Sequence, residues 1–546
     1  MSVPPAAFTH ARIITTKYPG TCAVCSQVVV IGERVALTRN DRGRSIVAHD
    51  TCVVSSNRTA QAVVALRAAS SATDADLTIN GLGGELLPFQ RAGVQYIELK
   101  RGRVLLADEM GLGKTCQTLA WLQMHKELRP AIIICPASVK INWQREAQKW
   151  LSDAPENQTA IAYGSEPFPQ AAITIINYDI AERFATNMRA LQTKVLVLDE
   201  CQYLKGDAGT EKRKGVQRVR TIYGYGSGRK HVPGIADDIP HILALSGTPI
   251  ENRPIELWNT AHALYPVVFD NYLKFAKQYA GAHKGYFGWN VSGSTNLAEL
   301  QTILRETCMV RRLKKDVLLE LPDKRRVTLP MELANRPEYI KAYNNLRQWL
   351  RDTGHSPEDI ARKMRAEVLT RIEVLKQVAV RGKLGAMFEW IDDQLATGEK
   401  LIVFAVHRAT VAAVAARYNA PTIMGSDDAA ARQQAVDTFQ NDPACQVIAC
   451  NLRAGGVGLN LTAASNVVSL ELGWTPTAHD QAEARAHRHG QKNAVTAWYL
   501  LAHGTIEEDI AQLIDRKRLT IQAVLDDGTA ADTGGILGAL IGKIIV

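Results

Sequence analysis

One stretch of the sequence has the residue types and the spacing of a phosphate-binding loop. It runs from Arg103 to Thr115 and reads Arg-Val-Leu-Leu-Ala-Asp-Glu-Met-Gly-Leu-Gly-Lys-Thr. Gly111 and Gly113 would let backbone N–H groups point at phosphates, while Lys114 reaches the outer phosphates and the Thr115 hydroxyl ligates Mg²⁺. Asp108 stands where the strict pattern has a small residue, so a purely structural turn is the alternative. Because an apolar strand precedes the loop and a helix follows it, we favour a nucleotide site.

A pair of carboxylates ends an apolar run further along the chain. Residues 194–198 read as a buried strand, and Asp199 and Glu200 follow directly. In a parallel sheet such acids meet a phosphate loop at one edge, where Asp199 would hold Mg²⁺ and Glu200 would orient or deprotonate water. The alternative is a strand that ends in solvated acids. Ahead of the loop, the Gln90 amide has the donor and acceptor needed to read adenine, although a solvated helical Gln is equally ordinary.

Two arginines lie about 370 residues after the loop. Residues 476–489 predict a helix, on which Arg485 and Arg488 are three apart and so share one face. Two adjacent guanidinium groups repel each other, which is tolerable where a triphosphate lies between them and a facing domain. A solvated basic helix is the alternative.

The N-terminal region has two close pairs of metal-binding residue types, Cys22 with Cys25 and His49 with Cys52. This spacing predicts a closed, tetrahedral Zn²⁺ site with a structural role. Four unconnected side chains are the alternative. A module of this size has a small core, so a metal would stabilise it.

The elements around these residues alternate between strand and helix in two blocks, with a mainly helical block between them. Such alternation predicts an α/β fold with doubly wound parallel sheets. We divide the chain into a zinc module (1–58), a linker (59–82), a first lobe (83–265), a helical insertion (266–382), a second lobe (383–525) and a tail (526–546). Residues 179–191 are predicted to be helical, and the apolar tail is read as a packing or partner segment.

Composition excludes several other classes of protein. The 546 residues are 46% hydrophobic and 22% charged, as in a globular protein, and no apolar run is long enough to span a membrane. The nine scattered cysteines indicate a reducing compartment without a disulfide framework. A net charge of +9 fits a polyanionic partner.

Taken in order, these motifs resemble the Swi/Snf-type ATPases of helicase superfamily two. The resemblance rests on residues 108–115, 199–200, Ser246-Gly-Thr-Pro249, 454–462 and 481–491. Residues 86–94, 288–300 and 311–317 look like its annealing-helicase (HARP-like) branch. The resemblance implies two RecA-like lobes with ATP and Mg²⁺ between them and duplex DNA across both. It also implies that Gln90, Asp108, Gly458 and Gln481 belong to the nucleotide site, that Arg485 and Arg488 act as arginine fingers, and that Ser246 and Thr248 couple the lobes.

One departure from that family concerns coupling. The family usually has Asp-Glu-Ala/Ser-His, whereas this chain has Cys201 and Gln202 after the two acids. ATP hydrolysis remains plausible, but its coupling to DNA is in question.

The sequence therefore predicts an ATP-dependent translocase on double-stranded or forked DNA that remodels forks, anneals strands or displaces proteins. An RNA-dependent helicase or RNA-polymerase recycling ATPase, and a non-enzymatic zinc-anchored DNA-binding adaptor, are the alternatives. We expect a monomer that works with replication or repair proteins and without a membrane. Its place would be the nucleoid in a bacterial or phage setting and the nucleus in a eukaryote.

Overall fold

The structure is a computed structural model of the whole chain. It describes residues 12–16, 20–23, 28–29, 34–39, 45–49, 64–151, 158–205, 214–226, 231–285, 288–455, 459–526 and 536–545. The chain forms two compact units: one comprises residues 1–71 with 305–307, and the other comprises the remainder.

The N-terminal unit is built from short antiparallel strands. A three-stranded sheet has the order β1 (Arg12–Thr15), β4 (Arg34–Arg39), β5 (Ser45–His49), and β2 (Gly20–Thr21) pairs with β3 (Val28–Val29). Among the described residues of this unit, Cys22, Val29, Val35 and Ala48 are buried together, and Ile14, Ile46 and Val47 pack against them.

The larger unit contains two parallel sheets, as the alternation predicts. The first has seven strands in the order β14 (Met309–Val310), β6 (Arg103–Leu106), β11 (His241–Leu245), β10 (Val195–Asp199), β7 (Ala131–Cys135), β9 (Ile173–Asn177) and β8 (Thr159–Ile161). The second has six in the order β15 (Lys324–Met331), β20 (Val495–Ala502), β19 (Asn466–Ser469), β16 (Leu401–Ala405), β18 (Val447–Asn451) and β17 (Thr422–Ile423). We call these the first and second lobes.

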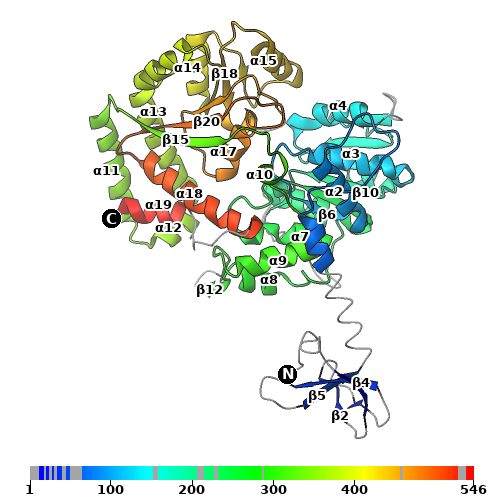
Figure 1. The fold of residues 1–546 in the computed structure, drawn as a ribbon. Helices are drawn as coiled ribbons and strands as arrows, with labels where there is room; N and C mark the ends of the chain where they lie inside the picture. The colour runs from blue at the N-terminus through cyan, green and yellow to red at the C-terminus, as the bar shows by residue number, and fades with distance from the viewer. Residues whose placement is uncertain are drawn as a thin grey trace. The chain divides into compact units, whose positions relative to one another are not determined.

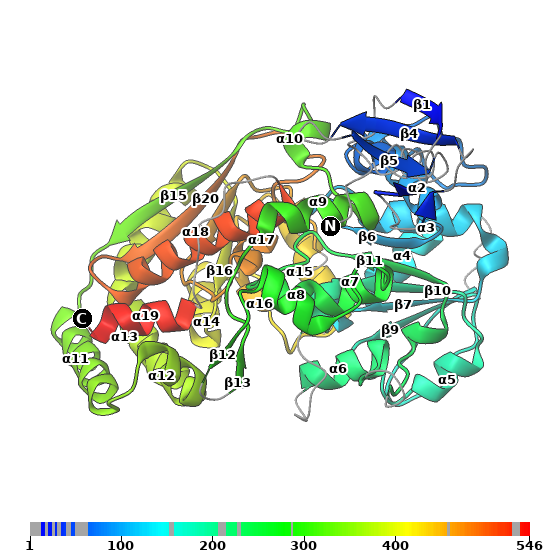
Figure 2. The ribbon, with the colours of Figure 1, turned by 90° about the horizontal axis from the view of Figure 1, so that it is seen from below.

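Helices cover both faces of the first sheet, which is why its central strands are apolar throughout. Figure 2 shows α3 (Lys114–Met124) and α4 (Lys140–Trp150) on one face, and α5 (Ala185–Ala190) and α6 (Lys214–Tyr223) on the other. The helices α2 (Pro88–Leu99), α7 (Trp258–Leu264), α8 (Tyr272–Tyr279) and α9 (Leu297–Thr307) complete this lobe.

The second lobe carries its helices in the same way. Figure 1 shows α13 (Arg365–Ala396), α14 (Arg408–Tyr418) and α15 (Ala429–Asn441) around β18 and β20. The short helices α16 (Leu452–Gly455) and α17 (Pro476–Glu483) follow β18 and β19, and α11 (Arg336–Asp352) and α12 (Pro357–Lys363) precede α13.

Helix α18 (Ile506–Leu525) belongs to the cores of both lobes. Its first half packs Ile506, Ile510 and Leu513 into the second lobe. Its last turn packs Val524 and Leu525 into the core that contains the first sheet. Figure 1 shows it as the orange-red helix that runs toward the first lobe. A rigid helix anchored at both ends links the positions of the two lobes.

Helices make up most of the described part of 266–382, as expected, and two strands of this block join the neighbouring sheets: β14 extends the first sheet and β15 pairs in parallel with β20 in the second. Two other expectations from the sequence need correction. The helix predicted over 179–191 is confined to α5, since 178–184 form turns that bury Ala181 and Phe184. The helix predicted over 476–489 ends at Glu483, whose buried carboxylate accepts hydrogen bonds from Lys324 and Arg326.

The apolar tail is a helix, α19 (Ile536–Ile545), that packs on the second lobe. Leu540, Ile541 and Ile544 are buried in the same core as the start of α18. The packing half of the expectation for this tail is therefore confirmed. None of the described helices is long and apolar enough to cross a membrane.

Candidate functional site

The phosphate loop lies between β6 and α3, where the strand–loop–helix pattern predicts it. Gly111 and Gly113 have positive φ of 88° and 78°, the left-handed region that favours glycine. A Cβ atom on Gly113 would lie 2.5 Å from the Gln90 amide nitrogen. The loop therefore requires glycine here, and it lies directly beside Gln90.

Two polar side chains, those of Gln90 and Lys114, donate hydrogen bonds to backbone carbonyls of the loop. Gln90, on α2, donates to the Leu112 carbonyl at 3.3 Å and accepts from the Leu87 N–H at 2.9 Å. Lys114, the first residue of α3, donates from Nζ to the Asp108 carbonyl at 2.7 Å. Burial lowers the pKa of Lys114 while Glu200, Asp108 and Asp199 raise it, so its ammonium lies among the predicted catalytic acids. Thr115 follows on α3 and is half-buried.

Asp108, the departure from the strict loop pattern, is engaged by its side chain. Its carboxylate accepts two hydrogen bonds from the Arg312 guanidinium, at 2.9 and 2.6 Å, and one from the Arg312 backbone N–H at 3.0 Å, and both side chains are almost fully buried. A paired, bidentate geometry is what makes a buried ion pair tolerable. Any contact of Asp108 with a nucleotide would be through its backbone, and its place among the cofactor-binding residues stays a prediction.

Asp199 and Glu200 lie at the carboxyl end of β10, the central strand of the first sheet. The Trp143 indole donates to Asp199 at 2.7 Å, and the Glu200 N–H donates to its other oxygen at 3.0 Å. Burial first, and then the neighbouring Glu200, raise the pKa of Asp199 to about 7. Glu200 has φ of 52°, an uncommon conformation for a residue with a side chain. Two neighbouring carboxylates whose negative charges repel each other form a site suited to a divalent cation.

A chain of hydrogen bonds connects Glu200 to the predicted coupling residues. Gln202 donates to the Glu200 carboxylate at 2.6 Å and accepts from the Ser246 hydroxyl at 2.6 Å. Ser246 Oγ in turn accepts from the Thr248 N–H at 3.0 Å. We call these four residues the relay. An amide can both donate and accept, so Gln202 joins a carboxylate to a hydroxyl, a geometry that the departure at 201–202 did not predict.

The two arginines of the second lobe face the first lobe across the cleft. Arg488 lies against the loop, because a Cβ on Gly111 would be 3.3 Å from the Arg488 Cβ. Burial and the charge of Arg488 lower the pKa of Arg485 to about 10, although the charge of Glu200 acts in the opposite direction. The helix has already ended, so a turn rather than a shared helical face brings the two guanidinium groups together: both donate to the Leu459 carbonyl.

Of the two remaining predicted nucleotide-site residues, Gln481 is described by the structure and Gly458 is not. Gln481 lies on α17, and its carbonyl accepts from Arg485 Nε at 3.1 Å. Gly458 lies outside the described residues.

The residues at the cleft fit ATP with Mg²⁺. The glycines bend the loop as a phosphate cradle requires, Lys114 is buried beside two acids, and two arginines from the other lobe lie within the same charged region. Sequence reasoning missed Trp143, Arg312 and Gln202 as supporting groups. The sequence shows only the identities of these residues, because the groups that they contact lie far away in the chain.

The predicted zinc ligands are described only in part. Among the described residues no group of three or more His, Cys, Asp or Glu could hold a metal ion. Cys25, Cys52 and the side chain of His49 lie outside that part of the chain, while Cys22 is buried just after β2. The zinc site therefore stays a prediction.

Two sequence-domain models match the chain. The sequence model of the SNF2-related domain matches residues 89–221 and 236–381, and that of the helicase conserved C-terminal domain matches 382–490. The mouse DNA annealing helicase and endonuclease ZRANB3 is 33% identical over 468 residues, which cover 82% of this chain and 41% of that protein.

Further relatives are similar. The SWI/SNF-related matrix-associated actin-dependent regulator of chromatin subfamily A-like protein 1 of Xenopus tropicalis is 31% identical over 462 residues, covering 83% of this chain and 46% of that protein. The chain thus spans less than half the length of these relatives. The solved SWI2/SNF2 ATPase core of Sulfolobus solfataricus in complex with dsDNA is 26% identical with a TM-score of 0.39, covering 83% of this chain and 95% of that one.

Proposed function

The chain belongs to the SNF2-related family of helicase-like ATPases, and on that premise we propose that it is a DNA-dependent ATPase that moves along duplex DNA. The observation that carries the proposal is the meeting of two half-sites. The loop, Asp199 and Glu200 come from the first lobe, and Arg485 and Arg488 come from the second.

Each side chain has a role that its surroundings support. Lys114 and Thr115 would hold ATP and Mg²⁺ at the loop, with Asp199 as the carboxylate nearest the metal. ATP supplies the phosphate bond whose hydrolysis provides the free energy. Glu200 orients the attacking water or takes its proton, and the relay through Gln202 holds its carboxylate in place. Arg485 and Arg488 offset negative charge only while the lobes are together, which ties hydrolysis to closure.

The test measures ATP turnover with and without DNA. We expect duplex DNA to raise the turnover, with little dependence on its sequence and a steep dependence on salt, because phosphate contacts dominate such binding. Turnover that does not respond to duplex or forked DNA would falsify the proposal. Parallel reactions with RNA and with single strands separate it from an RNA-dependent helicase.

We also propose fork remodelling and strand annealing as the form that this activity takes. The ZRANB3 relative, which is named as a DNA annealing helicase, supports this proposal. So do residues 288–300 and 311–317, whose sequence resembles the annealing-helicase branch. Replication and repair proteins would be the partners, in the nucleus or the nucleoid. The assay follows the closing of a partly unwound plasmid. A protein that hydrolyses ATP on duplex DNA but leaves the bubble open would refute the annealing part alone.

A structural Zn²⁺ site in the N-terminal unit is a separate proposal. Its support is that the Ala23 N–H donates to the Val47 carbonyl at 2.8 Å, which brings the loop after Cys22 beside β5, the strand that ends at His49. One equivalent of zinc should purify with the protein, and Cys22→Ser combined with Cys25→Ser should release it. Metal-free protein with a fully folded N-terminal unit would contradict the site.

A further inference from the structure

A small hairpin of the first lobe lies outside both parallel sheets. It consists of β12 (His283–Gly285) and β13 (Gly288–Asn290), which form a two-stranded sheet of their own in the described part of the chain. Figure 2 shows the hairpin beside α8. A single two-stranded hairpin is at best marginally stable in water, so this one contributes little to holding the fold together. The side chains that it presents to solvent are therefore candidates for binding a partner.

The hairpin exposes a tryptophan. The indole side chain of Trp289 belongs to a residue that is 47% exposed. The chain has nine tryptophans, and the other eight are buried or half-buried. A tryptophan contributes most to stability when its large ring is buried, and exposed rings are enriched where a protein binds a partner.

Two lysines flank this ring. Lys284 lies directly opposite Trp289 in the register of the hairpin, so the two side chains share one face. Lys277 comes from α8, and its ammonium nitrogen lies 5.3 Å from the centroid of the indole ring, a cation–π contact. Both lysines are exposed. The ring thus has one positive charge beside it on the neighbouring strand and another on the adjacent helix.

The charge around the ring is mainly positive. Lys274 is three positions before Lys277 and so lies on the same face of α8. It is 3.8 Å from Asp270, and because both side chains are well exposed, water screens this pair. On α9, Glu299 accepts a hydrogen bond from the Tyr279 hydroxyl at 3.3 Å. Strands β12 and β13 contain no acidic residue. A negatively charged partner is therefore favoured over a cationic one.

An exposed aromatic ring between lysines matches the chemistry of an unpaired nucleotide. The flat face of a nucleobase stacks on an aromatic side chain, while lysines attract the phosphates on either side of it. The bases inside a duplex are already stacked on one another, so their faces are covered. An acidic peptide would satisfy the lysines but would leave the indole ring without a flat partner. The observations therefore favour a single strand.

We propose that Trp289, together with Lys277 and Lys284, binds an unpaired nucleotide of a DNA strand by stacking on its base. The inference rests on the proposed function, because it gives the first lobe a contact with the single-stranded part of a fork or bubble. Stacking is possible with every base, so the contact is independent of sequence. None of these three residues belongs to the nucleotide cleft, so ATP hydrolysis on duplex DNA does not require them.

The test follows the fluorescence anisotropy of a labelled oligothymidylate, which cannot pair with itself, as the full chain is added. Trp289→Ala and Trp289→Leu should weaken binding about 5–100-fold, because neither side chain offers a face for stacking. Trp289→Phe keeps an aromatic face and should stay within about threefold of wild type. Lys284→Gln should reduce the slope of the logarithm of the affinity against the logarithm of the salt concentration by about 0.7, the loss of one phosphate contact.

Tyr225→Ala is the matched control. Tyr225 is 40% exposed, and the Arg220 guanidinium lies 4.9 Å from the centroid of its ring, so it combines an exposed ring and a cation elsewhere in the first lobe. This variant should bind the oligothymidylate as wild type does. The turnover of ATP on duplex DNA should stay within about twofold of wild type in every variant, which also shows that each is folded.

Four results would overturn the inference. They are the absence of oligothymidylate binding by wild type, unchanged binding in Trp289→Ala, a loss in Tyr225→Ala as large as that in Trp289→Ala, and full binding by Trp289→Leu, which would indicate an apolar contact in place of stacking. Wild-type turnover that still rises with duplex DNA would leave the proposed function standing in each case. A chain that binds the oligothymidylate through Trp289 but whose turnover ignores duplex DNA would refute the proposed function alone.

Discussion

Gln202 joins the Glu200 carboxylate to the Ser246 hydroxyl, and its replacement by leucine gives the sharpest test of the proposed role of the relay. Leucine has a similar size but neither donates nor accepts. The variant loses the bond from Gln202 to Glu200 and the bond from Ser246 to Gln202, both 2.6 Å long. It leaves the Ser246 hydroxyl, which is fully buried, without its acceptor.

The size of the effect follows from these two bonds. Glu200 is half-buried, so water replaces part of its lost bond, and the cost arises mainly at Ser246. We expect the free energy of unfolding to fall by about 2 kcal/mol. A positioned base contributes ~10²–10⁴-fold to turnover, and a base that is present but no longer held should forfeit ~10–100-fold of it.

The assay compares kcat and KM for ATP with and without saturating duplex DNA. In Gln202→Leu the stimulated kcat should fall by about 10–100-fold while the KM for ATP changes less than about threefold, because the Gln202 side chain bonds Glu200 and Ser246 and not the phosphate loop. Gln202→His should retain most of the stimulation, since histidine also donates and accepts and stands at this position in the resembling family. Gln202→Glu, the same size but charged, should behave like leucine or worse beside Glu200.

A double-mutant cycle with Ser246→Ala tests whether the bonds act as one path. If they do, the double variant should be no slower than the slower single variant. Two results would refute the reasoning: DNA stimulation that survives in Gln202→Leu, or effects of the two substitutions that simply multiply.

Three other perturbations have definite expected outcomes. Lys114→Ala should lower ATP turnover at least ~100-fold in a steady-state assay, because it removes a preorganised cation from the loop. His407 bonds Glu471 at 3.0 Å and Glu373 at 3.2 Å, and these bonds raise its pKa from 6.5 to about 9. The stability it contributes is complete below pH 6.5 and is lost as pH rises toward 9, so wild type should lose up to about 2 kcal/mol over that range that His407→Asn does not lose, by urea unfolding. Ile541→Ala, at a fully buried position of α19, should lower the free energy of unfolding by about 2–4 kcal/mol.

An exposed position gives the control for the stability measurement, and each prediction has an outcome that would contradict it. Leu519→Ala, at a half-exposed position on α18, should cost less than about 0.5 kcal/mol. Full ATP turnover in Lys114→Ala would favour the non-enzymatic adaptor. Parallel pH curves for wild type and His407→Asn would show that the histidine is not held by its carboxylates, and an unchanged stability in Ile541→Ala would show that α19 is not docked in solution.

The sequence predicts the parts of the site whose signals are local. Gly111, Gly113 and Lys114 lie between an apolar strand and a helix, and the pattern itself fixes their geometry. Asp199 ends a buried strand, so its place at the sheet edge follows from the rules of parallel sheets. The arrival of Arg485 and Arg488 from the second lobe needed the resemblance, because nothing local says which domain they face.

The remaining features depend on partners that are distant in the chain. Residues 484–489 contain no glycine or proline, so no local signal ends α17 at Glu483; from Arg485 on the backbone tightens into turns, and the Glu483 carboxylate is held by Lys324 and Arg326, which are distant in the chain. The relay joins Gln202 to Ser246, 44 positions away. The sequence presents Gln202 as a departure from the family that puts coupling in question, and the structure shows that its amide bonds both Glu200 and Ser246.

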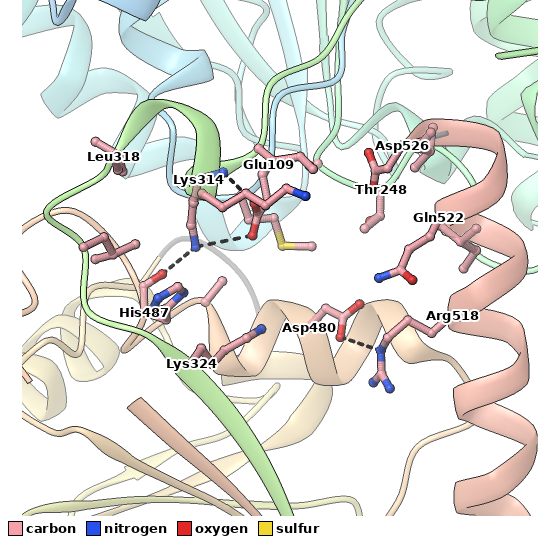
Figure 3. A pocket seen from close by; sticks show the side chains of 18 of the residues that line it. Glu109, Thr248, Lys314, Leu318, Lys324, Asp480, His487, Arg518, Gln522 and Asp526 are labelled. Atoms are coloured by element: carbon pink, nitrogen blue, oxygen red, sulfur yellow. Dashed lines mark hydrogen bonds and ion pairs between the residues drawn. The ribbon is translucent and has the colours of Figure 1, made fainter. Parts of the chain in front are cut away.

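Residues 311–314 illustrate how one short segment contacts parts of the molecule that are distant in the chain. After β14, three cations within four residues reach three different parts of the molecule. Arg311 pairs with Asp526 at the end of α18, Arg312 pairs with Asp108 at the start of the phosphate loop, and Lys314 donates to the carbonyl of His487, next to Arg488 (Figure 3). The first two contacts are buried ion pairs, which are costly to break singly. The third is a single bond to a backbone carbonyl, so it is the weakest of the three. When the lobes separate, the segment should therefore stay with the loop and α18 while the contact between Lys314 and His487 opens.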